Sequence, residues 1–492
     1  MPSLNTGSPM EGTERSQKGR VTVYTVTGCP HCRQAKSRLS ELGLQVHEVD
    51  MNQHAELWPQ VKQLTGRSTV PQIFFNSIHV GGNDDLQTMV PEKLENLVHL
   101  VREEPVPPNS PPLPEEAHLE GAGNQDGEIM CERDEFADMM AEFKQCGAIG
   151  SHRKGLKVYG NSFKGAQLVD WLQREKGLDR SKAFETSKIL MDRKFFNSVQ
   201  RKGEFEESNA LFRLLEHDPH SALNAREMAT CSPLQASELS EILRNMMLKL
   251  YSDYLSADGK SVDYKAMSRS PSFEQYCELA VQLQRVDLQA LSREEKLAFF
   301  INIYNALVIH GNLRLGSPKN MWQRYRFFNY VSYLIGGEVF TLQDIENGVL
   351  RGNKKGVAQL LKPFSKSDPR LQVALADAEP LIHFALNCGA RGCPPIKTYT
   401  PKDIDVQLQI AAEAFLENDD GCRVDGDKGE VKLSQIFKWY KGDFGDTDEK
   451  VLNWILNHMS DSPKKSSLQA LLKAAGLKVS YMPYDWSTNS KD

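Results

Sequence analysis

Apolar residues along the chain fall into three long stretches, and two polar segments separate them. The first polar segment, 105–127, is rich in Pro, Gly and acidic residues, a composition typical of an extended linker. The second, 217–235, contains small and polar residues with turn-forming prolines and predicts a shorter linker. The pattern therefore predicts a disordered tail and three folded regions, at 1–19, 20–104, 128–216 and 236–485.

The first folded region alternates between the period of a strand and that of a helix. Its β-branched and aromatic run at 21–26 is typical of a buried strand. The pattern predicts, in order, a strand at 21–26, a helix with Ala35, Leu39 and Leu42 on one face, a strand at 44–50, a helix at 55–64 and a strand at 70–76. This alternation predicts an α/β domain with βαβ connections.

The middle region shows the helix period first and the strand period last. Three helices are predicted, around 136–143, 163–172 and 183–191, and a closing hairpin over 205–214. The region contains no catalytic constellation of residue types. The order helix–helix–helix–hairpin favours a winged-helix binding module.

The C-terminal region contains the most apolar helix of the chain. Ser292 and Glu295 fit a capping box at its start, and Gly311 is the predicted end. The helix is apolar on almost every face and is therefore predicted to be central. Asn302 and Asn305 share one face, and buried amides need partners, so they bind either the backbone of a neighbouring loop or a substrate.

Composition excludes several classes of protein. The 492 residues allow about three domains of ~100–200 residues each. Hydrophobic residues make up 40% and charged residues 25%, values of a globular rather than a disordered chain. A net charge of −6 argues against a protein that coats nucleic acid, so we predict no nucleic-acid partner. Nine cysteines, an odd number at ordinary density, indicate a reducing compartment.

No targeting segment is evident in the sequence. The first 20 residues are polar and lack the apolar core of a signal peptide. The most apolar stretch, 297–309, is interrupted by Asn302 and Asn305 and is too short to span a bilayer. We therefore expect a cytoplasmic protein, peripheral at membranes if its middle domain binds lipid.

The pair Cys29 and Cys32 lies between the first strand and the first helix. Unpaired N–H groups and the positive end of the helix dipole stabilise a thiolate at that position. Cys29 is then the predicted nucleophile, and Cys32, one turn further, resolves a mixed disulfide. Half of a zinc site is the alternative, but this region holds no second CxxC or His pair, and we predict no metal.

Three separated motifs within 20–104 resemble the glutaredoxin family. They are Cys29-Pro30-His31-Cys32, the segment RSTVPQ at 67–72 and the segment GGNDD at 81–85. The resemblance implies a thioredoxin-like fold, disulfide oxidoreductase activity, glutathione as co-substrate and disulfide-containing proteins as partners. It implies that the backbone of Val70, before a cis proline, pairs with the cysteinyl part of glutathione, and that the third motif binds the γ-glutamyl end. The implied glutathione-binding residues are Arg67, Thr69, Val70, Pro71, Gly82, Asn83 and Asp84.

Two positions depart from the family pattern. Val26 stands where the family usually has Lys, and His31 where Tyr is common. Loss of the cation should raise the pKa of Cys29 and weaken the contact with a glutathione carboxylate. His31 either compensates in part when protonated or is an exposed turn residue. Reduced redox activity is therefore one expectation.

The segment FKGAQLVDWL at 163–172 resembles the signature of the DEP domain, over about 130–215. The resemblance implies targeting to a membrane or a receptor in a signalling protein. A basic cluster could meet anionic lipid headgroups, or it is simply a solvated charged face. The cluster consists of His152, Arg153, Lys154, Lys157 and Lys164.

A second cysteine motif lies in the C-terminal region, where an apolar run ends in Asn387-Cys388-Gly389 and Cys393 follows. His383 and Cys388 are close enough in the sequence to form a Cys/His pair. In a strand, however, their side chains would point to opposite faces, and in a helix their spacing falls short of the ideal. A nucleophile role for Cys388 therefore needs a tertiary turn at Asn387. Otherwise Cys388 and Cys393 are buried thiols, a metal pair or a reversible disulfide.

Three segments resemble the domain of unknown function family 547, over roughly 285–425. They are the cysteine motif just described, the segment NIYNAL at 302–307 and the segment FTLQDIENGVLR at 340–351. The resemblance transfers no activity. Asp344, Glu346 and Arg351 are functional candidates, with ordinary charges at a helix N-terminus as the alternative.

The predicted fold class is multidomain α/β and α+β, with a thioredoxin-like first domain, a winged-helix middle domain and a helix-rich α+β C-terminal domain. The predicted function is glutathione-dependent thiol–disulfide exchange coupled to a DEP signalling or targeting module. One alternative is a signalling scaffold with a weakened redox domain. The other is a hydrolase in the C-terminal domain that uses Cys388 and His383, with Cys393, Asn302 and Asn305 in the same site.

Overall fold

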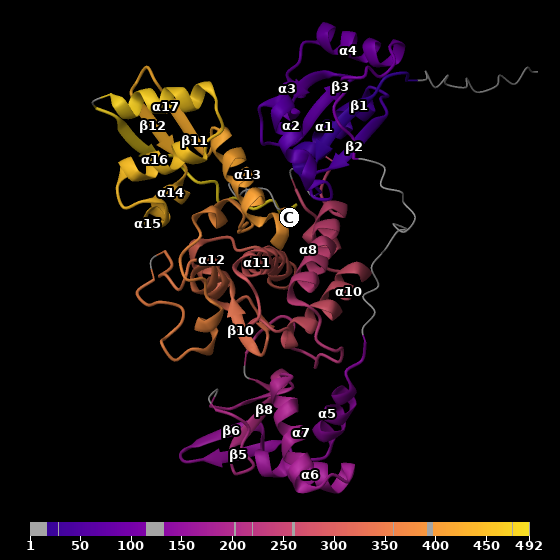
Figure 1. Ribbon diagram of the computed structural model, residues 1–492, viewed down its shortest axis with the longest axis vertical. Coiled ribbons are helices and arrows are strands. Elements are labelled where there is room, and N and C mark those ends of the chain that lie inside the picture. Colours follow the sequence, from indigo (N-terminus) through magenta and orange to yellow (C-terminus); the bar gives the residue numbers. More distant parts are fainter. Residues whose placement is uncertain are drawn as a thin grey trace, which may run out of the picture. The chain divides into compact units, whose positions relative to one another are not determined.

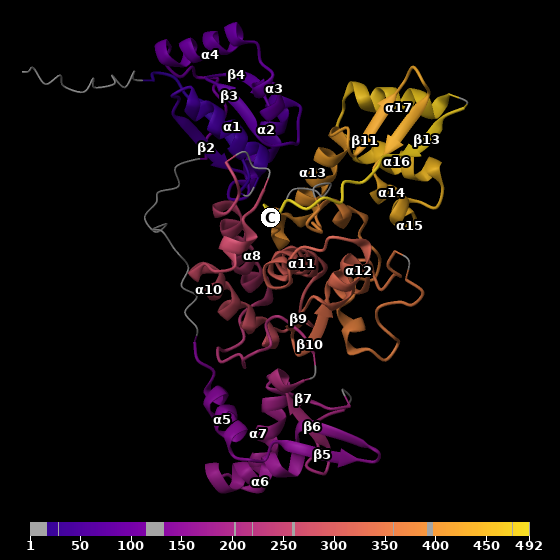
Figure 2. The ribbon, with the colours of Figure 1, turned by 180° about the vertical axis from the view of Figure 1, so that it is seen from behind.

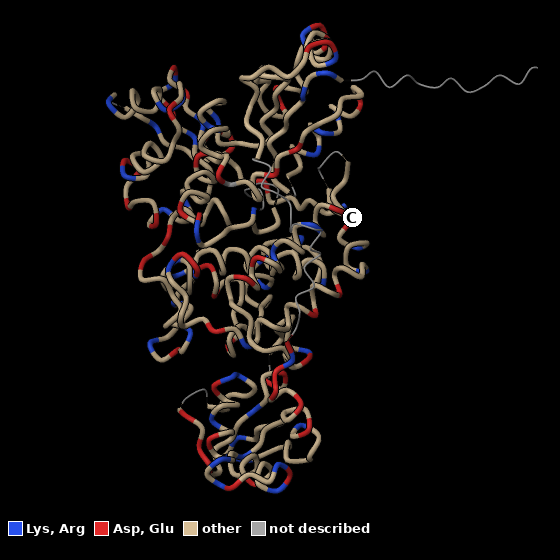
Figure 3. Tube along the Cα trace, turned by 45° about the vertical axis from the view of Figure 1, so that its right-hand side comes forward, with Lys and Arg blue, Asp and Glu red and all other residues tan. Residues whose placement is uncertain are grey.

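The computed structural model describes residues 17–27, 29–114, 132–200, 203–218, 220–257, 261–357, 359–390, 397–474 and 476–491. The chain forms two compact units, shown in Figures 1 and 2. The first unit comprises residues 1–118 with 257–259, and the second comprises 119–256 with 260–492. Acidic and basic residues are interspersed along the trace of both (Figure 3).

The first unit is built on a four-stranded sheet of order β2-β1-β3-β4, in which β1 is parallel to β2 and antiparallel to β3. All five residues of β1 are buried, as the apolar run predicts. The elements are β1 (Val21–Thr25), α1 (Pro30–Glu41), β2 (Val46–Asp50), a 3₁₀ turn (Ala55–Leu57), α2 (Trp58–Thr65), β3 (Gln72–Phe75), β4 (Ile78–Gly81), α3 (Asn83–Gln87) and α4 (Pro91–Glu103).

The start of the predicted linker packs against this unit. Arg20 donates to the carbonyl of Pro111 at 2.6 Å, and the Tyr24 hydroxyl donates to the carbonyl of Pro112. The carbonyls of Pro111 and Pro112 are thus used as acceptors by the first unit. Residues 105–114 therefore continue the first unit rather than leaving it at 104.

The middle region of the second unit has a sheet of order β5-β6-β8-β7 over an aromatic core that includes Phe143, Phe163, Trp171 and Phe212. The edge-on packing of Phe163 against Phe143 and Phe196 is typical of aromatic cores. The elements are α5 (Glu135–Gln145), β5 (Gly150–Lys154), β6 (Lys157–Lys164), α6 (Gly165–Lys176), α7 (Arg180–Asp192), β7 (Phe196–Ser198) and β8 (Leu211–Leu214).

The predicted order helix–helix–helix–hairpin is wrong in two respects. A hairpin of β5 and β6 stands between the first and second helices, and the basic cluster lies on it. Most of its side chains are exposed on both faces, so the hairpin lacks the alternation of polar and apolar residues that reveals a half-buried strand. In addition, the closing strand β8 pairs with β7 and β6 rather than with a strand starting at 205.

The C-terminal region is mainly helical, with two hydrophobic cores. Its first half contains α8 (Ala236–Asp253), α9 (Tyr264–Met267), α10 (Pro271–Ala280), α11 (Arg293–Leu315), α12 (Met321–Tyr330), β9 (Ser332–Ile335), β10 (Glu338–Thr341) and a π-helical turn (Asp344–Leu350). Its second half contains α13 (Ile404–Glu417), β11 (Cys422–Asp425), β12 (Glu430–Leu433), α14 (Gln435–Trp439), α15 (Lys441–Phe444), α16 (Asp448–His458), α17 (Pro463–Lys473) and β13 (Lys478–Tyr481). Short 3₁₀ turns lie at Val281–Arg285, Pro369–Val373, Pro380–Phe384 and Pro401–Asp403.

The central helix α11 begins as predicted but ends later. The capping box is confirmed, since Ser292 and Glu295 each accept the other's backbone N–H. The helix continues past Gly311 to Leu315. A Cβ at Gly311 would lie 2.7 Å from Cζ of Phe327, so this glycine serves close packing of α12 rather than termination.

The segment predicted as a second linker is packed within the second unit. The buried Asn224 side chain donates to the carbonyls of Ala280 and Leu334, both at 2.9 Å, and accepts the Leu334 N–H. Nearby, Arg285 forms a buried ion pair with Asp134 at the start of the middle region. The middle and C-terminal regions are therefore joined by polar contacts within one compact unit. Among the described residues, no helix combines the length and apolarity that crossing a membrane requires.

Candidate functional site

Cys29 occupies the N-cap position of α1, directly before Pro30. Its sulfur accepts the backbone N–H of Cys32 at 3.1 Å. Both thiols are buried, with exposed fractions of 5% and 2%. A sulfur that caps a helix receives hydrogen bonds and the positive end of the dipole, which are the conditions that stabilise a thiolate.

The two thiols differ electrostatically. Burial raises the pKa of Cys32 well above its usual range, and the hydrogen bond and charge of Cys29 raise it further. Lys36 opposes this rise, but its ammonium group is also paired with Glu48 at 2.7 Å. Cys32 therefore holds its proton more tightly than an ordinary thiol, whereas Cys29 occupies the helix N-cap.

The second and third motifs meet beside this helix. The Val70–Pro71 peptide bond is cis, as the resemblance implies. Arg67 pairs with Asp85 at 2.6 Å, and the same carboxylate accepts the N–H of Gly82 at 2.8 Å. The ion pair therefore ties the loop before β3 to the loop that opens α3.

The third motif is also tied to α1. The buried Asn83 side chain donates to Gln34 Oε1 at 2.9 Å. Asp84 is exposed, and Thr69 and Val70 are half-buried. The side chains of Gln34 and Asp85 thus connect the three motifs, although neither was among the predicted site residues. Asp85 has a sequence signal, because it lies at the third helical position after the cap; Gln34 has none.

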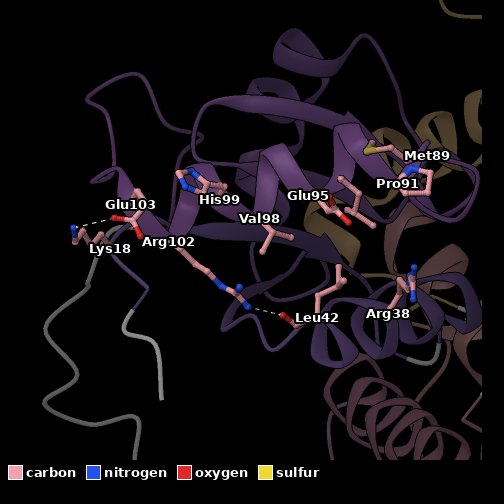
Figure 4. Close-up of a pocket in the computed structure, with 11 residues that line it drawn as sticks. Lys18, Arg38, Leu42, Met89, Pro91, Glu95, Val98, His99, Arg102 and Glu103 are labelled. Atoms are coloured by element: carbon pink, nitrogen blue, oxygen red, sulfur yellow. Dashed lines mark hydrogen bonds and ion pairs between the residues drawn. The ribbon is translucent and has the colours of Figure 1, made fainter. Parts of the chain in front are cut away.

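A hollow of about 950 Å³ lies on another side of the same unit, between α4 and the end of α1 (Figure 4). Apolar side chains from Leu42, Leu94 and Val98 line it, and Arg102 crosses it to donate to the Leu42 carbonyl at 3.0 Å. At a rise of ~1.5 Å per residue, Arg38 on its rim lies about 14 Å along the helix from Cys29. The hollow is therefore separate from the dithiol.

The basic cluster of the middle region surrounds an apolar hairpin tip. Leu156, in the turn between β5 and β6, is 94% exposed, and Val158 is 66% exposed. Arg153, Lys154 and Lys157 are exposed beside them. The other two basic side chains are less available, since His152 contacts the Ser162 hydroxyl at 3.1 Å and Lys164 is half-buried at the end of β6.

In the C-terminal region His383 belongs to a buried charged network. Its Nε2 lies 2.9 Å from Oδ2 of Asp443, which also accepts Arg351 Nε at 2.5 Å. Lys354 reaches the second oxygen of the same carboxylate at 3.0 Å. Burial alone would raise the pKa of Asp443, but the hydrogen bonds from His383 and Arg351 outweigh it and hold that pKa well below its usual range.

A tyrosine completes this network. The Tyr440 ring stacks on His383 with centroids 3.9 Å apart, and its hydroxyl donates to Glu346 at 2.5 Å. Glu346 comes from a π-helical turn, an irregularity frequent at functional sites. Burial lowers the pKa of His383, although Asp443 and Glu346 oppose the shift. The geometry thus places an oriented neutral imidazole among fixed charges. We call His383, Asp443, Arg351, Glu346 and Tyr440 the imidazole network.

The remaining predicted residues have different positions. The side chains of Asn302 and Asn305 are buried and bind backbone groups. Asn302 binds the carbonyl and the N–H of Tyr399. Asn305 binds the carbonyl of Ala385 and the N–H of Asn387. Asp344 pairs with Arg370 at 2.9 Å, outside the imidazole network.

The predicted cysteine pair of this region is described only in part. The Cys388 sulfur lies 3.9 Å from the Tyr484 hydroxyl and acts electrostatically on Tyr440. Cys393 lies outside the described residues. A nucleophile role for Cys388 with His383 stays a prediction. Within the described ranges, no three His, Cys, Asp or Glu side chains are grouped to hold a metal ion.

Comparison with known proteins identifies three regions of the chain. Residues 21–80 match the family described as glutaredoxin, and residues 148–214 match the domain found in Dishevelled, Egl-10 and Pleckstrin. Residues 288–416 match a family of proteins of unknown function, DUF547. These matches confirm the three resemblances.

Several individual proteins are similar to the first unit. Glutaredoxin 3 of Escherichia coli strain K12 is 39% identical over 69 residues, which are 14% of this chain and 83% of that protein. Hybrid peroxiredoxin hyPrx5 of Haemophilus influenzae is 39% identical over 67 residues, 14% of this chain and 27% of that protein. The solution structure of glutaredoxin from Brucella melitensis has 38% identity, covers 18% of this chain and 92% of that one, and gives a TM-score of 0.16.

The N-terminal domain is therefore a thiol–disulfide oxidoreductase module with a thioredoxin-like fold. Through this domain the chain belongs to the glutaredoxin family, and it carries a DEP domain and a DUF547 domain besides.

Proposed function

We propose that the N-terminal domain is a glutathione-dependent dithiol oxidoreductase, and that the chain couples it to a DEP targeting module. The observation that carries the proposal is the N-cap position of Cys29, whose sulfur accepts the Cys32 N–H at 3.1 Å. The neighbouring Cys32 keeps its proton, because burial and Cys29 raise its pKa. One thiol is thus prepared for attack and the other for later resolution.

The chemistry follows from this difference. The Cys29 thiolate attacks one sulfur of a substrate disulfide, so a Cys29–substrate bond forms and the second substrate sulfur leaves as a thiolate that takes up a proton. Cys32 then loses its proton, attacks Cys29 and releases the substrate thiol, or glutathione does so instead. Two molecules of glutathione restore the dithiol and leave as glutathione disulfide.

The motif loops support the choice of glutathione as co-substrate. The residues proposed to contact it are Arg67, Thr69, Val70, Pro71, Gly82, Asn83 and Asp84, which come from the two loops that Asp85 and Gln34 hold beside α1. The Val70 backbone precedes β3 and lies outside its ladder with β1, where it can pair with a peptide-like ligand.

A glutathione-coupled disulfide reduction assay on the full chain tests the proposal. Cys29→Ser should lower turnover by about a hundredfold or more, because it removes the nucleophile. Cys32→Ser should retain reduction of glutathione mixed disulfides and lose much of the activity on protein disulfides. Cys146→Ser, at an exposed thiol outside the site, is the matched control. Equal turnover of wild type and Cys29→Ser would contradict the proposal.

We also propose that the tip of the β5–β6 hairpin binds an anionic membrane surface from the cytoplasm. The observation that favours this is the joint exposure of Leu156 and Val158 between basic side chains. Each Lys or Arg near an anionic surface contributes about 1 kcal/mol, and the apolar tip would enter the interface. A signalling receptor that presents an acidic surface is the other occupant that the DEP resemblance implies.

Flotation of the full chain with vesicles tests the membrane proposal. Binding should require anionic lipid at low salt and should fall about tenfold in Lys154→Glu/Lys157→Glu and in Leu156→Ser/Val158→Ser. Arg180→Glu/Lys182→Glu, which makes the same charge change at two exposed positions of α7, should bind as wild type. Absence of binding to anionic vesicles would exclude the membrane and leave the receptor.

A further inference from the structure

A second polar cluster, far from the imidazole network in the sequence, surrounds the half-buried thiol of Cys277. Cys277 lies on α10, and its sulfur is 3.2 Å from Nη2 of Arg314 and 3.8 Å from Nε2 of His310, both on α11. Helices α8, α10 and α11 pack together around one hydrophobic core (Figures 1 and 2). A nucleophilic side chain thus has a guanidinium and an imidazole within contact distance.

The imidazole of this cluster is fixed from behind. Nδ1 of His310 lies 2.7 Å from the Tyr333 hydroxyl, which is itself 2.7 Å from the Tyr276 hydroxyl. His310 is 1% exposed, and burial lowers its pKa to about 3, with Arg314 and Arg226 adding to the shift. A neutral imidazole has one donor and one acceptor nitrogen, so the chain Tyr276–Tyr333–His310 directs either an N–H or a lone pair at the sulfur.

Two cations, Arg314 and Arg226, and one carboxylate, Glu274, act on the thiol, and Arg314 also pairs with Glu274 at 3.7 Å. Arg314 lies over the Phe273 ring at 4.8 Å, which limits where its guanidinium can move. The exposed Arg226 acts on the same sulfur electrostatically. Burial raises the pKa of Cys277, and the carboxylate of Glu274 adds to the rise. The two cations act in the opposite direction and lower this pKa. The thiolate, once formed, would therefore be stabilised by Arg314 at the edge of the protein.

We propose that Cys277 is a modification site that forms a mixed disulfide with glutathione. The tripeptide carries two carboxylates, which match the guanidinium groups of Arg314 and Arg226. The oxidant is glutathione disulfide: the Cys277 thiol releases its proton, its sulfur attacks one sulfur of the disulfide, the Cys277–glutathione bond forms, and the second glutathione leaves as a thiolate that is protonated. The proposal rests on this cluster alone and is independent of the redox function proposed for Cys29.

Rate measurements with two disulfides of opposite charge test the proposal. The full chain with Cys29→Ser, which disables exchange at the N-terminal domain, is treated with glutathione disulfide or with the cationic disulfide cystamine. Mass spectrometry of peptides follows Cys277 and, as an exposed reference thiol, Cys146. Each rate is divided by the rate at which a small thiol in solution reacts with the same disulfide, which corrects for the intrinsic reactivity of that disulfide.

We expect Cys277 to react with glutathione disulfide about fivefold or more faster than with cystamine after this correction. Arg314→Met should abolish the preference while its apolar stem still covers Phe273. Arg314→Lys should retain part of the preference, and Arg326→Met, an equal charge loss at an exposed position of α12, should retain all of it. If Arg314→Met does not fold, high salt on the parent chain should remove the preference instead. An unmodified Cys277 beside a modified Cys146, or equal corrected rates for both reagents, would overturn the proposal.

Discussion

Nε2 of His383 and Oδ2 of Asp443, which are 60 residues apart in the sequence, lie 2.9 Å apart in the interior of the C-terminal region. His383 lies within the residues that match the DUF547 family, and Asp443 lies beyond them. The carboxylate is shared with Arg351 and Lys354, so two cations and an imidazole meet one buried anion. Removing one member of a buried ion pair leaves the others without compensation, which makes such a group a sensitive point for stability.

Asp443→Asn should therefore lower the free energy of unfolding by about 3–5 kcal/mol, because it leaves Arg351 buried without its counter-charge. Chemical denaturation followed by fluorescence measures this. Asp448→Asn removes one partner of the exposed Lys441–Asp448 pair and should change stability by less than about 1 kcal/mol. Equal effects of the two substitutions would show that the imidazole network contributes no more to the free energy of unfolding than a surface ion pair does.

Asp85→Asn should loosen the proposed glutathione site without changing the thiols. Burial would raise the pKa of Asp85, but Arg67 and the Gly82 N–H outweigh it, so the carboxylate is ionised and holds both loops. Neutralising it should raise KM for glutathione about fivefold with a smaller change in kcat. Glu92→Gln, an exposed change on α4, is the control. A loss confined to kcat would indicate that Asp85 acts on the dithiol instead.

Acid should destabilise the second unit through His310. Its pKa is about 3 in the folded chain, whereas an unfolded histidine has a value of about 6.5. The unfolded state binds more protons between these values, so the free energy of unfolding falls as pH decreases from about 6.5 toward 3. His310→Gln should have a shallower slope over this window, whereas His31→Gln, at an exposed residue, should leave it unchanged. Parallel slopes for wild type and His310→Gln would contradict the prediction.

Arg285→Met should separate the unfolding of the middle region from that of the C-terminal region. Arg285 pairs with Asp134, donates to the Arg193 carbonyl at 2.8 Å and lies 3.8 Å over the Phe195 ring. Met keeps the apolar contact and removes the charge that the buried Asp134 needs. Calorimetry should show the middle and C-terminal regions unfolding in one transition for wild type and in two for the variant. Arg174→Met, at an exposed ion pair on α6, should preserve the single transition.

Local signals in the sequence were sufficient to predict several features of the structure. Cys29 precedes a proline at the first turn of a helix, and Ser292 and Glu295 form a capping box within four residues. Such features depend on neighbours in the chain, so spacing reveals them. The sequence pattern did not predict the β5–β6 hairpin, because strands exposed on both faces show no alternation of apolar and polar residues.

The sequence by itself determined the order of domains, the dithiol and the central apolar helix, because each depends on residues within one or two helical turns. Only the tertiary structure decided which polar residues meet. It brought Asp443 and Tyr440 to His383, separated Asp344 from Glu346, and placed Cys277 between His310 and Arg314. The physical reason is that a buried charge or hydrogen-bonding group must find a partner somewhere, while local spacing does not specify which distant segment supplies it.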